Sequence, residues 1–159
     1  MKKLSKIKFT IVFFLIITLS FAQETHLKNL TKLTFGGDNA EAYFSPNSKM
    51  LTLQVTNPEI GASCDQIYLL DLQQKNIDTK SLKRISTGKG RTTCSYFMPD
   101  GKHILYASTQ GSNDACPPPP KPINGKYLWA IYPEYDIYVA DLKGNIVKKL
   151  TNTPGYDAE

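Results

Sequence analysis

Three cysteines are the residues of this chain best suited to chemistry: Cys64, Cys94 and Cys116. Cysteines pair into disulfides, bind metal ions or act as nucleophiles, and an odd number leaves at least one outside any disulfide. No Cys-x-x-Cys or His-x-x-x-His spacing is present, and neither His26 nor His103 lies beside a cysteine. The sequence therefore gives no support for a metal site. Disulfides would require export from the cytoplasm.

Two glycine-rich segments resemble catalytic or phosphate-binding motifs only in part. Gly61–Asp65 begins like a nucleophile turn but lacks the closing glycine. Gly88–Thr92 lacks both the four-residue gap and the Lys-Ser/Thr pair of a phosphate loop. We therefore expect no catalytic residue, no cofactor and no enzymatic activity in this chain.

Residues 1–22 have the pattern of a secretory signal peptide. The basic residues Lys2, Lys3, Lys6 and Lys8 precede the apolar run Phe9–Leu19, and small residues flank Phe21. We expect cleavage after Ala22, which leaves residues 23–159 in the periplasm or secreted, without a stable membrane anchor. The alternative is a retained anchor, for which the apolar run is short.

The positive charge of the chain belongs mostly to this N-terminal segment. The whole sequence has 19 basic and 14 acidic residues, and four of the basic residues lie in residues 1–22. The remaining chain has 15 basic and 14 acidic residues, a net charge of +1. Nothing in this balance points to a nucleic-acid partner.

The rest of the sequence contains an internal repeat. Tyr43–Lys49 returns 53 residues later as Tyr96–Lys102, and Gln66–Leu72 returns as Asp136–Leu142. Each first segment ends in a turn signal, which is strongest in Pro99-Asp100-Gly101. Self-similarity over such a period indicates a repeat architecture.

Each repeat unit predicts four short strands rich in aliphatic and aromatic residues. In the first unit they are Ala42–Phe44, Met50–Thr56, Gln66–Leu72 and about Ser81–Ser86; in the second they are about Ser95–Phe97, His103–Ala107, Asp136–Leu142 and Ile146–Thr151. Repeated units of four antiparallel strands are typical of the blades of a β-propeller. The predicted fold class is therefore all-β.

The repeated phrases resemble the TolB-like propeller repeat, which is similar to the blades of prolyl-oligopeptidase-type enzymes. The resemblance rests on the Tyr-Phe-x-Pro turn and the Asp-Ile-Tyr and Leu-Thr phrases, and it covers residues 30–159. It implies a closed ring of blades. This chain has two complete units, about 35–86 and 87–151. The start of a third, near residue 152, is predicted because Gly155–Glu159 echoes Gly37–Glu41. We therefore expect the missing blades of the same polypeptide as a partner.

Propeller topology brings the three cysteines toward one face. Cys64 precedes a third strand, Cys116 lies in the equivalent region of the next unit, and Cys94 enters a first strand. Our leading interpretation is a disulfide between Cys94 and Cys116, or between Cys94 and Cys64. The alternatives are partly buried thiols or a metal site.

Aligned units place Glu41, Cys94 and Glu159 at one position, on entry to the strand that lines a propeller channel. Its neighbours Asp38, Asn39, Tyr156 and Asp157 are acidic, amide or aromatic residues. Such groups suit a cation or a peptide terminus. The alternative is that they satisfy turn backbone.

The second unit is stretched by an insertion near residues 109–134. Pro117–Pro122 favours an extended conformation, and aromatic residues including Trp129 and Tyr132 follow it. The insertion is either an aromatic recognition loop or a loop held against its own blade by its aromatic rings.

The sequence thus predicts an exported TolB-like propeller segment that acts as a protein- or peptide-binding scaffold. The alternative is the N-terminal propeller of a secreted peptidase whose catalytic domain lies beyond residue 159.

Overall fold

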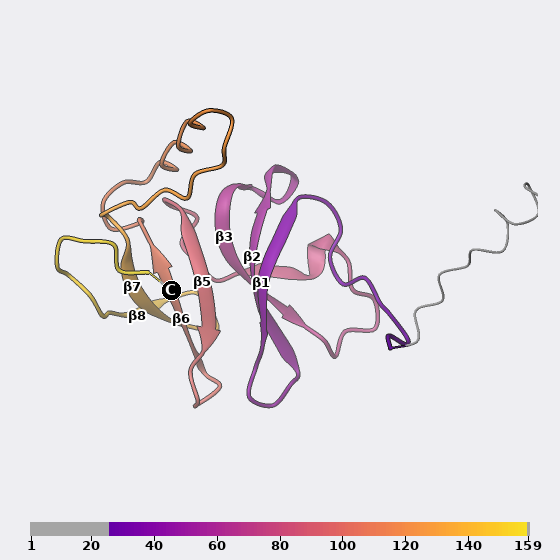
Figure 1. Cartoon of the computed structure of the whole chain (residues 1–159). Coiled ribbons are helices and arrows are strands. Elements are labelled where there is room, and N and C mark those ends of the chain that lie inside the picture. The colour runs from indigo at the N-terminus through magenta and orange to yellow at the C-terminus, as the bar shows by residue number, and fades with distance from the viewer. Residues whose placement is uncertain (1–25, 159) are drawn as a thin grey trace, which may run out of the picture. The chain divides into compact units, whose positions relative to one another are not determined.

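The computed structural model describes residues 26–158, and the two sheets lie in the unit Leu33–Glu159. The first sheet contains β1 (Asp38–Phe44), β2 (Met50–Asn57), β3 (Ala62–Asp71) and β4 (Leu82–Arg84). The second contains β5 (Thr92–Phe97), β6 (His103–Ser108), β7 (Asp136–Asp141) and β8 (Ile146–Lys149). In each sheet the order in space follows the chain and all neighbours are antiparallel (Figure 1). We call the two sheets the first and the second blade. The predicted signal peptide lies outside the described residues.

The two blades share one register. Tyr43 pairs with Thr52, and Tyr96 pairs with Leu105, 53 residues further along. Tyr68 and Tyr138 likewise sit opposite Leu53 and Tyr106. The correspondence predicted for these tyrosines is therefore confirmed by strand pairing.

Equivalent turns close the first hairpin of each blade. In the first blade, Asn47 Oδ1 accepts a hydrogen bond from Lys49 N at 3.1 Å. In the second, Asp100 Oδ1 accepts one from Lys102 N at 2.8 Å. Ser48 and Gly101 both adopt a positive φ, of 57° and 62°. These side-chain bonds explain why Asn, Asp and Gly mark the turns.

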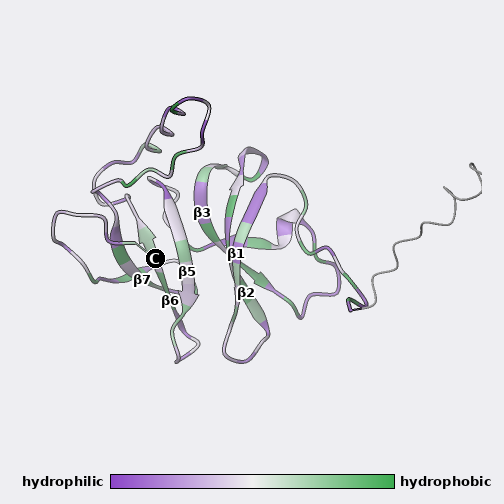
Figure 2. Ribbon diagram, in the orientation of Figure 1, coloured by the Kyte–Doolittle hydropathy of each residue, from purple (hydrophilic) through white to green (hydrophobic). Residues whose placement is uncertain are grey.

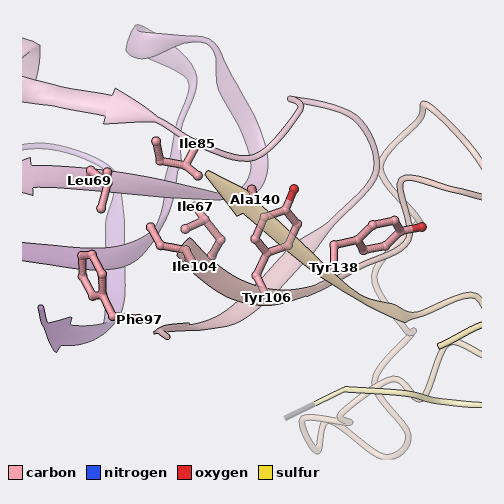
Figure 3. Close-up of a cluster of buried hydrophobic side chains, with 8 residues drawn as sticks. All are labelled: Ile67, Leu69, Ile85, Phe97, Ile104, Tyr106, Tyr138 and Ala140. Atoms are coloured by element: carbon pink, nitrogen blue, oxygen red, sulfur yellow. The ribbon is translucent and has the colours of Figure 1, made fainter. Parts of the chain in front are cut away.

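A buried apolar layer joins the two blades (Figure 3). The first blade contributes Ile67 and Leu69 of β3 with Ile85, and the second contributes Phe97, Ile104, Tyr106, Tyr138 and Ala140. Side chains alternate between the faces of a strand, so the other face of the first blade carries a second cluster around Leu53, Val55 and Leu70. Hydrophobic and hydrophilic segments accordingly follow one another along the strands (Figure 2).

Polar bonds cross the same interface. Thr52 Oγ1 and Ser95 Oγ lie 2.7 Å apart and are buried. Gln66 Nε2 donates to Gly90 O at 2.9 Å. Buried hydroxyl and amide groups that are satisfied in this way fix the position of one sheet on the next.

The outer face of the second blade lacks the cover that the first blade has. Ile85 N donates to Ile67 O, and Leu150 N makes the equivalent bond to Ile137 O. Ile85 is fully buried beneath the second blade, whereas Leu150 is 46% exposed.

Candidate functional site

A cavity of about 220 Å³ opens where the two blades meet the insertion, and we call it the arch pocket. The lining residues come from the second half of β2, the first half of β3, the start of β5 and the loop before β7. Its lining is aromatic on one side and polar on the other: Gln54, Asp65, Arg91, Thr93, Pro120, Tyr127, Leu128, Trp129, Ala130, Tyr132, Tyr135 and Tyr156.

Arg91 is at the centre of the polar side. Its Nε lies 3.5 Å from Asp65 Oδ2, and both side chains are about one-quarter exposed. The other oxygen of Asp65 accepts a hydrogen bond from the Thr56 hydroxyl. The Arg91 guanidinium also stands 6.0 Å from the centre of the Tyr132 ring. The pocket therefore contains an ion pair between the first blade and the segment that opens the second.

The aromatic side of the pocket is a connected group of rings. Trp129 Nε1 donates to Tyr156 OH at 3.3 Å. Tyr156 meets Tyr135 edge-on at 5.5 Å, and Tyr132 lies 6.3 Å from Tyr135. Tyr132 OH donates to Pro118 O, which ties the aromatic segment to the proline run. Burial raises the pKa of Tyr135, so this phenol stays neutral at physiological pH.

The aromatic residues in and after the insertion differ widely in burial. Tyr135, which follows it, is buried and anchors the chain to the second blade. Trp129 is 60% exposed and Tyr127 is 80% exposed. The interpretation that its aromatic rings hold the insertion against its own blade is wrong for Trp129, whose ring is mostly exposed and whose Nε1 donates to Tyr156 OH.

The disulfide predicted through Cys94 is also wrong. Cys64 of β3 pairs with Cys116 of the insertion, with 5.9 Å between their Cα atoms. Cys94 instead occupies a bulge of β5, where its φ is 47°. There the thiol lies 3.3 Å from Thr93 Oγ1, and Cys94 lines a different cavity. The bulge directs this side chain away from the end of the sheet where Cys64 and Cys116 meet.

That second cavity, the inner-strand pocket, measures about 410 Å³. Its lining is Glu41, Tyr43, Cys94, Ser95, Tyr96 and Leu105. Glu41 and Cys94 occupy equivalent bulges, with φ of 49° and 47°, as their alignment predicts. Tyr43 OH donates to Glu41 Oε2 at 2.7 Å, which raises the pKa of Tyr43.

The structure thus distributes the predicted site residues between the two pockets and positions outside them. Trp129, Tyr132 and Tyr156 line the arch pocket, whereas Glu41 lines the inner-strand pocket. The other predicted site residues line neither pocket. Asp38 is exposed at the start of β1, Asn39 Nδ2 donates to Gly36 O at 3.0 Å, and Asp157 N donates to Tyr135 O at 3.2 Å. Glu159 lies outside the described residues.

Sequence reasoning missed the polar side of the arch pocket. Gln54 and Thr93 come from different blades, and Thr93 Oγ1 donates to Gln54 Oε1 at 2.7 Å. Asp65 and Arg91 lie in Gly61–Asp65 and Gly88–Thr92, two segments that complete no catalytic or phosphate-binding motif, so neither residue was predicted to be part of a site. Within residues 26–158, no group of three or more His, Cys, Asp or Glu residues is arranged to hold a metal ion. In the same range, no helix has the length and apolarity to cross a membrane.

No protein-family model and no curated protein matches the chain. A solved structure described as "putative TolB from Agrobacterium tumefaciens" is similar to it, with a TM-score of 0.53 and 17% sequence identity. The match covers 80% of this chain but 39% of that structure, so the chain spans well under half of its length. At this identity the likeness shows the fold alone. The chain is an all-β protein of two four-stranded antiparallel sheets, and their arrangement is similar to that of consecutive propeller blades in this structure.

Proposed function

We propose that this chain is an exported TolB-like propeller segment that binds a protein or peptide at the arch pocket and has no catalysis of its own. The arch pocket itself is the observation that carries this proposal. Aromatic side chains with polar tips, together with an arginine, are the residues enriched at the centres of protein interfaces. Trp129 and Tyr127 present much of their surface to solvent there.

A disulfide and a buried aromatic side chain together restrain the insertion. The Cys64–Cys116 disulfide ties the start of the insertion to the first blade, and Tyr135 anchors its end. A loop that is restrained in this way loses less conformational entropy when a ligand binds. A disulfide at this position also fits a protein that works in the periplasm or outside the cell.

Ser63 and His103 could supply a nucleophile and a base, but they lie at opposite ends of different blades, which favours a binding role. Ser63 is in the first half of β3, at the arch end of its sheet. The ring of His103 pairs with Asp100 at 2.6 Å, in the turn at the opposite end of the second blade.

We propose that a further blade of the same polypeptide covers the outer face of the second blade. The equivalent face of the first blade is buried by its successor, and Leu150 is left half-exposed where Ile85 is buried. A blade that continues the register would bury Leu150 as the second blade buries Ile85.

Peptide selection against the purified chain tests the binding role. Peptides from a displayed random library would be enriched on the wild type and then titrated against Trp129→Ala and Tyr96→Ala. Both aromatic residues are 60% exposed, so Tyr96, in the inner-strand pocket, is a matched control. Enriched peptides should bind Tyr96→Ala normally and lose affinity for Trp129→Ala. Undiminished binding to Trp129→Ala would rule out the arch pocket as the binding site.

A further inference from the structure

The polar side of the arch pocket has hydrogen-bond donors that meet no good acceptor. Arg91 Nε is buried and makes no geometrically sound hydrogen bond within the described residues. Its contact with Asp65 is a 3.5 Å ion pair, and Nη2 has a 3.8 Å contact with Cys116 Sγ. Sulfur is a weak acceptor, so most of the five donors of this guanidinium are poorly used.

The carboxylate and amide oxygens of the pocket are, by contrast, already engaged. Asp65 accepts from Thr56 with one oxygen and faces Arg91 with the other. Gln54 Oε1 accepts from Thr93 Oγ1 and, at 3.3 Å, from Cys94 N. The amide nitrogen of Gln54 is therefore a further donor that a ligand can meet. A cation would find aromatic faces here but no carboxylate oxygen without a partner, whereas an anion would find donors.

The rest of the lining suits an apolar group. Tyr127, Leu128 and Trp129 line the same cavity as the ion pair, together with Pro120 and Tyr135. A cavity of about 220 Å³ is small, and it suits a ligand of the size of one large side chain with its carboxylate.

We propose that the arch pocket binds a carboxylate attached to an apolar or aromatic group, with Arg91 as the anion-binding residue. The planar fork of arginine matches the two oxygens of a carboxylate. The same chemistry is present at the C-terminal end of a peptide and in a small free acid. This inference rests on the proposed binding function and adds to it the chemical class of the ligand.

The single tryptophan of the chain provides the measurement, because Trp129 lines the pocket. Its fluorescence would be titrated with N-acetyl-Gly-Gly-Phe as the free acid, with the same peptide as its amide, and with N-acetylphenylalanine. The wild type should bind the acid at least about tenfold more tightly than the amide, as expected for a charge-assisted pair.

Variants of the two arginines of the chain test the residue assignment. Arg91→Gln should bind acid and amide equally, whereas Arg84→Gln, at an exposed position of β4, should keep the preference. Arg91→Lys keeps a charge beside Asp65 but loses the fork, so part of the preference should disappear. If Arg91→Gln fails to fold in a melting experiment, Arg91→Lys decides the question.

The results of these titrations distinguish between the two sources of the carboxylate and test the assignment of Arg91. Tighter binding of the tripeptide acid than of N-acetylphenylalanine assigns the site to chain ends, and equal binding assigns it to small free acids. Equal binding of acid and amide to the wild type, or no fluorescence change with either, overturns the inference. A preference that survives in Arg91→Lys without change also overturns it. Library peptides that bind through Trp129 with no need for a carboxylate would leave the proposed function intact.

Discussion

Cys64 and Cys116 form a disulfide that joins β3 of the first blade to the insertion of the second. The bond closes a long loop, because the two residues are 52 positions apart in sequence. Both ends of this disulfide are next to the ion pair of the arch pocket, since Asp65 follows Cys64 and Arg91 contacts Cys116. The disulfide therefore holds the start of the insertion beside the ion pair that lines the arch pocket.

Removal of this disulfide should destabilise the protein. We expect Cys64→Ser/Cys116→Ser to lower the free energy of unfolding by about 2–4 kcal/mol, because the unfolded chain regains the entropy that the crosslink removes. Chemical denaturation under non-reducing conditions measures this. Cys94→Ser is the control and should change stability by less than about 1 kcal/mol. One titratable thiol is expected in the unfolded, unreduced chain, and three would contradict the pairing.

The backbone at Cys94 gives a second prediction. A φ of 47° costs a residue with a Cβ atom roughly 1–2 kcal/mol. Glycine tolerates this conformation, and a β-branched residue tolerates it least. Cys94→Gly should therefore be more stable than Cys94→Val by at least about 1 kcal/mol in thermal or chemical unfolding. Equal stability of the two variants would show that the bulge is not kept in solution.

The parts of the fold that the sequence predicts well are those that local patterns specify. The Tyr43 and Tyr96 phrases set the same turn and register in both blades, and their rings meet edge-on at 5.5 Å. Strand ends differ from the prediction by a few residues. Chiefly, β1 and β3 extend further toward their N-termini and include polar residues such as Asp38 and Asp65.

The candidate site was predictable only on its aromatic side. Trp129 and Tyr132 belong to a conspicuous insertion, and Tyr156 follows the last strand by a few residues. Arg91, Asp65 and Gln54 have no local signal, since they meet only when one blade packs on the next. The predicted cysteine pairing was wrong for a related reason, because a single bulge determines which pocket Cys94 lines.

Burial of Tyr106 should make stability depend on alkaline pH. Burial raises the pKa of this phenol from 10.0 to about 12. The folded state therefore holds the proton more tightly than the unfolded state. This contribution is complete below pH 10 and is lost as the pH rises toward 12, by roughly 1.4 kcal/mol per pH unit. Denaturation between pH 9 and 12 should show this slope, and Tyr106→Phe should make it shallower.

The last prediction separates anchoring from recognition within the aromatic side of the arch pocket. Tyr135 is 4% exposed and Trp129 is 60% exposed. Tyr135→Ala removes a buried ring and should cost about 3–5 kcal/mol of folding free energy. Trp129→Ala removes a ring that is mostly in solvent, and should cost no more than about 1 kcal/mol while it weakens peptide binding. Chemical denaturation of both variants, with peptide titrations of the folded proteins, measures the two effects. A large loss of stability in Trp129→Ala would mean that the ring supports the blade, and the insertion would then be a structural loop.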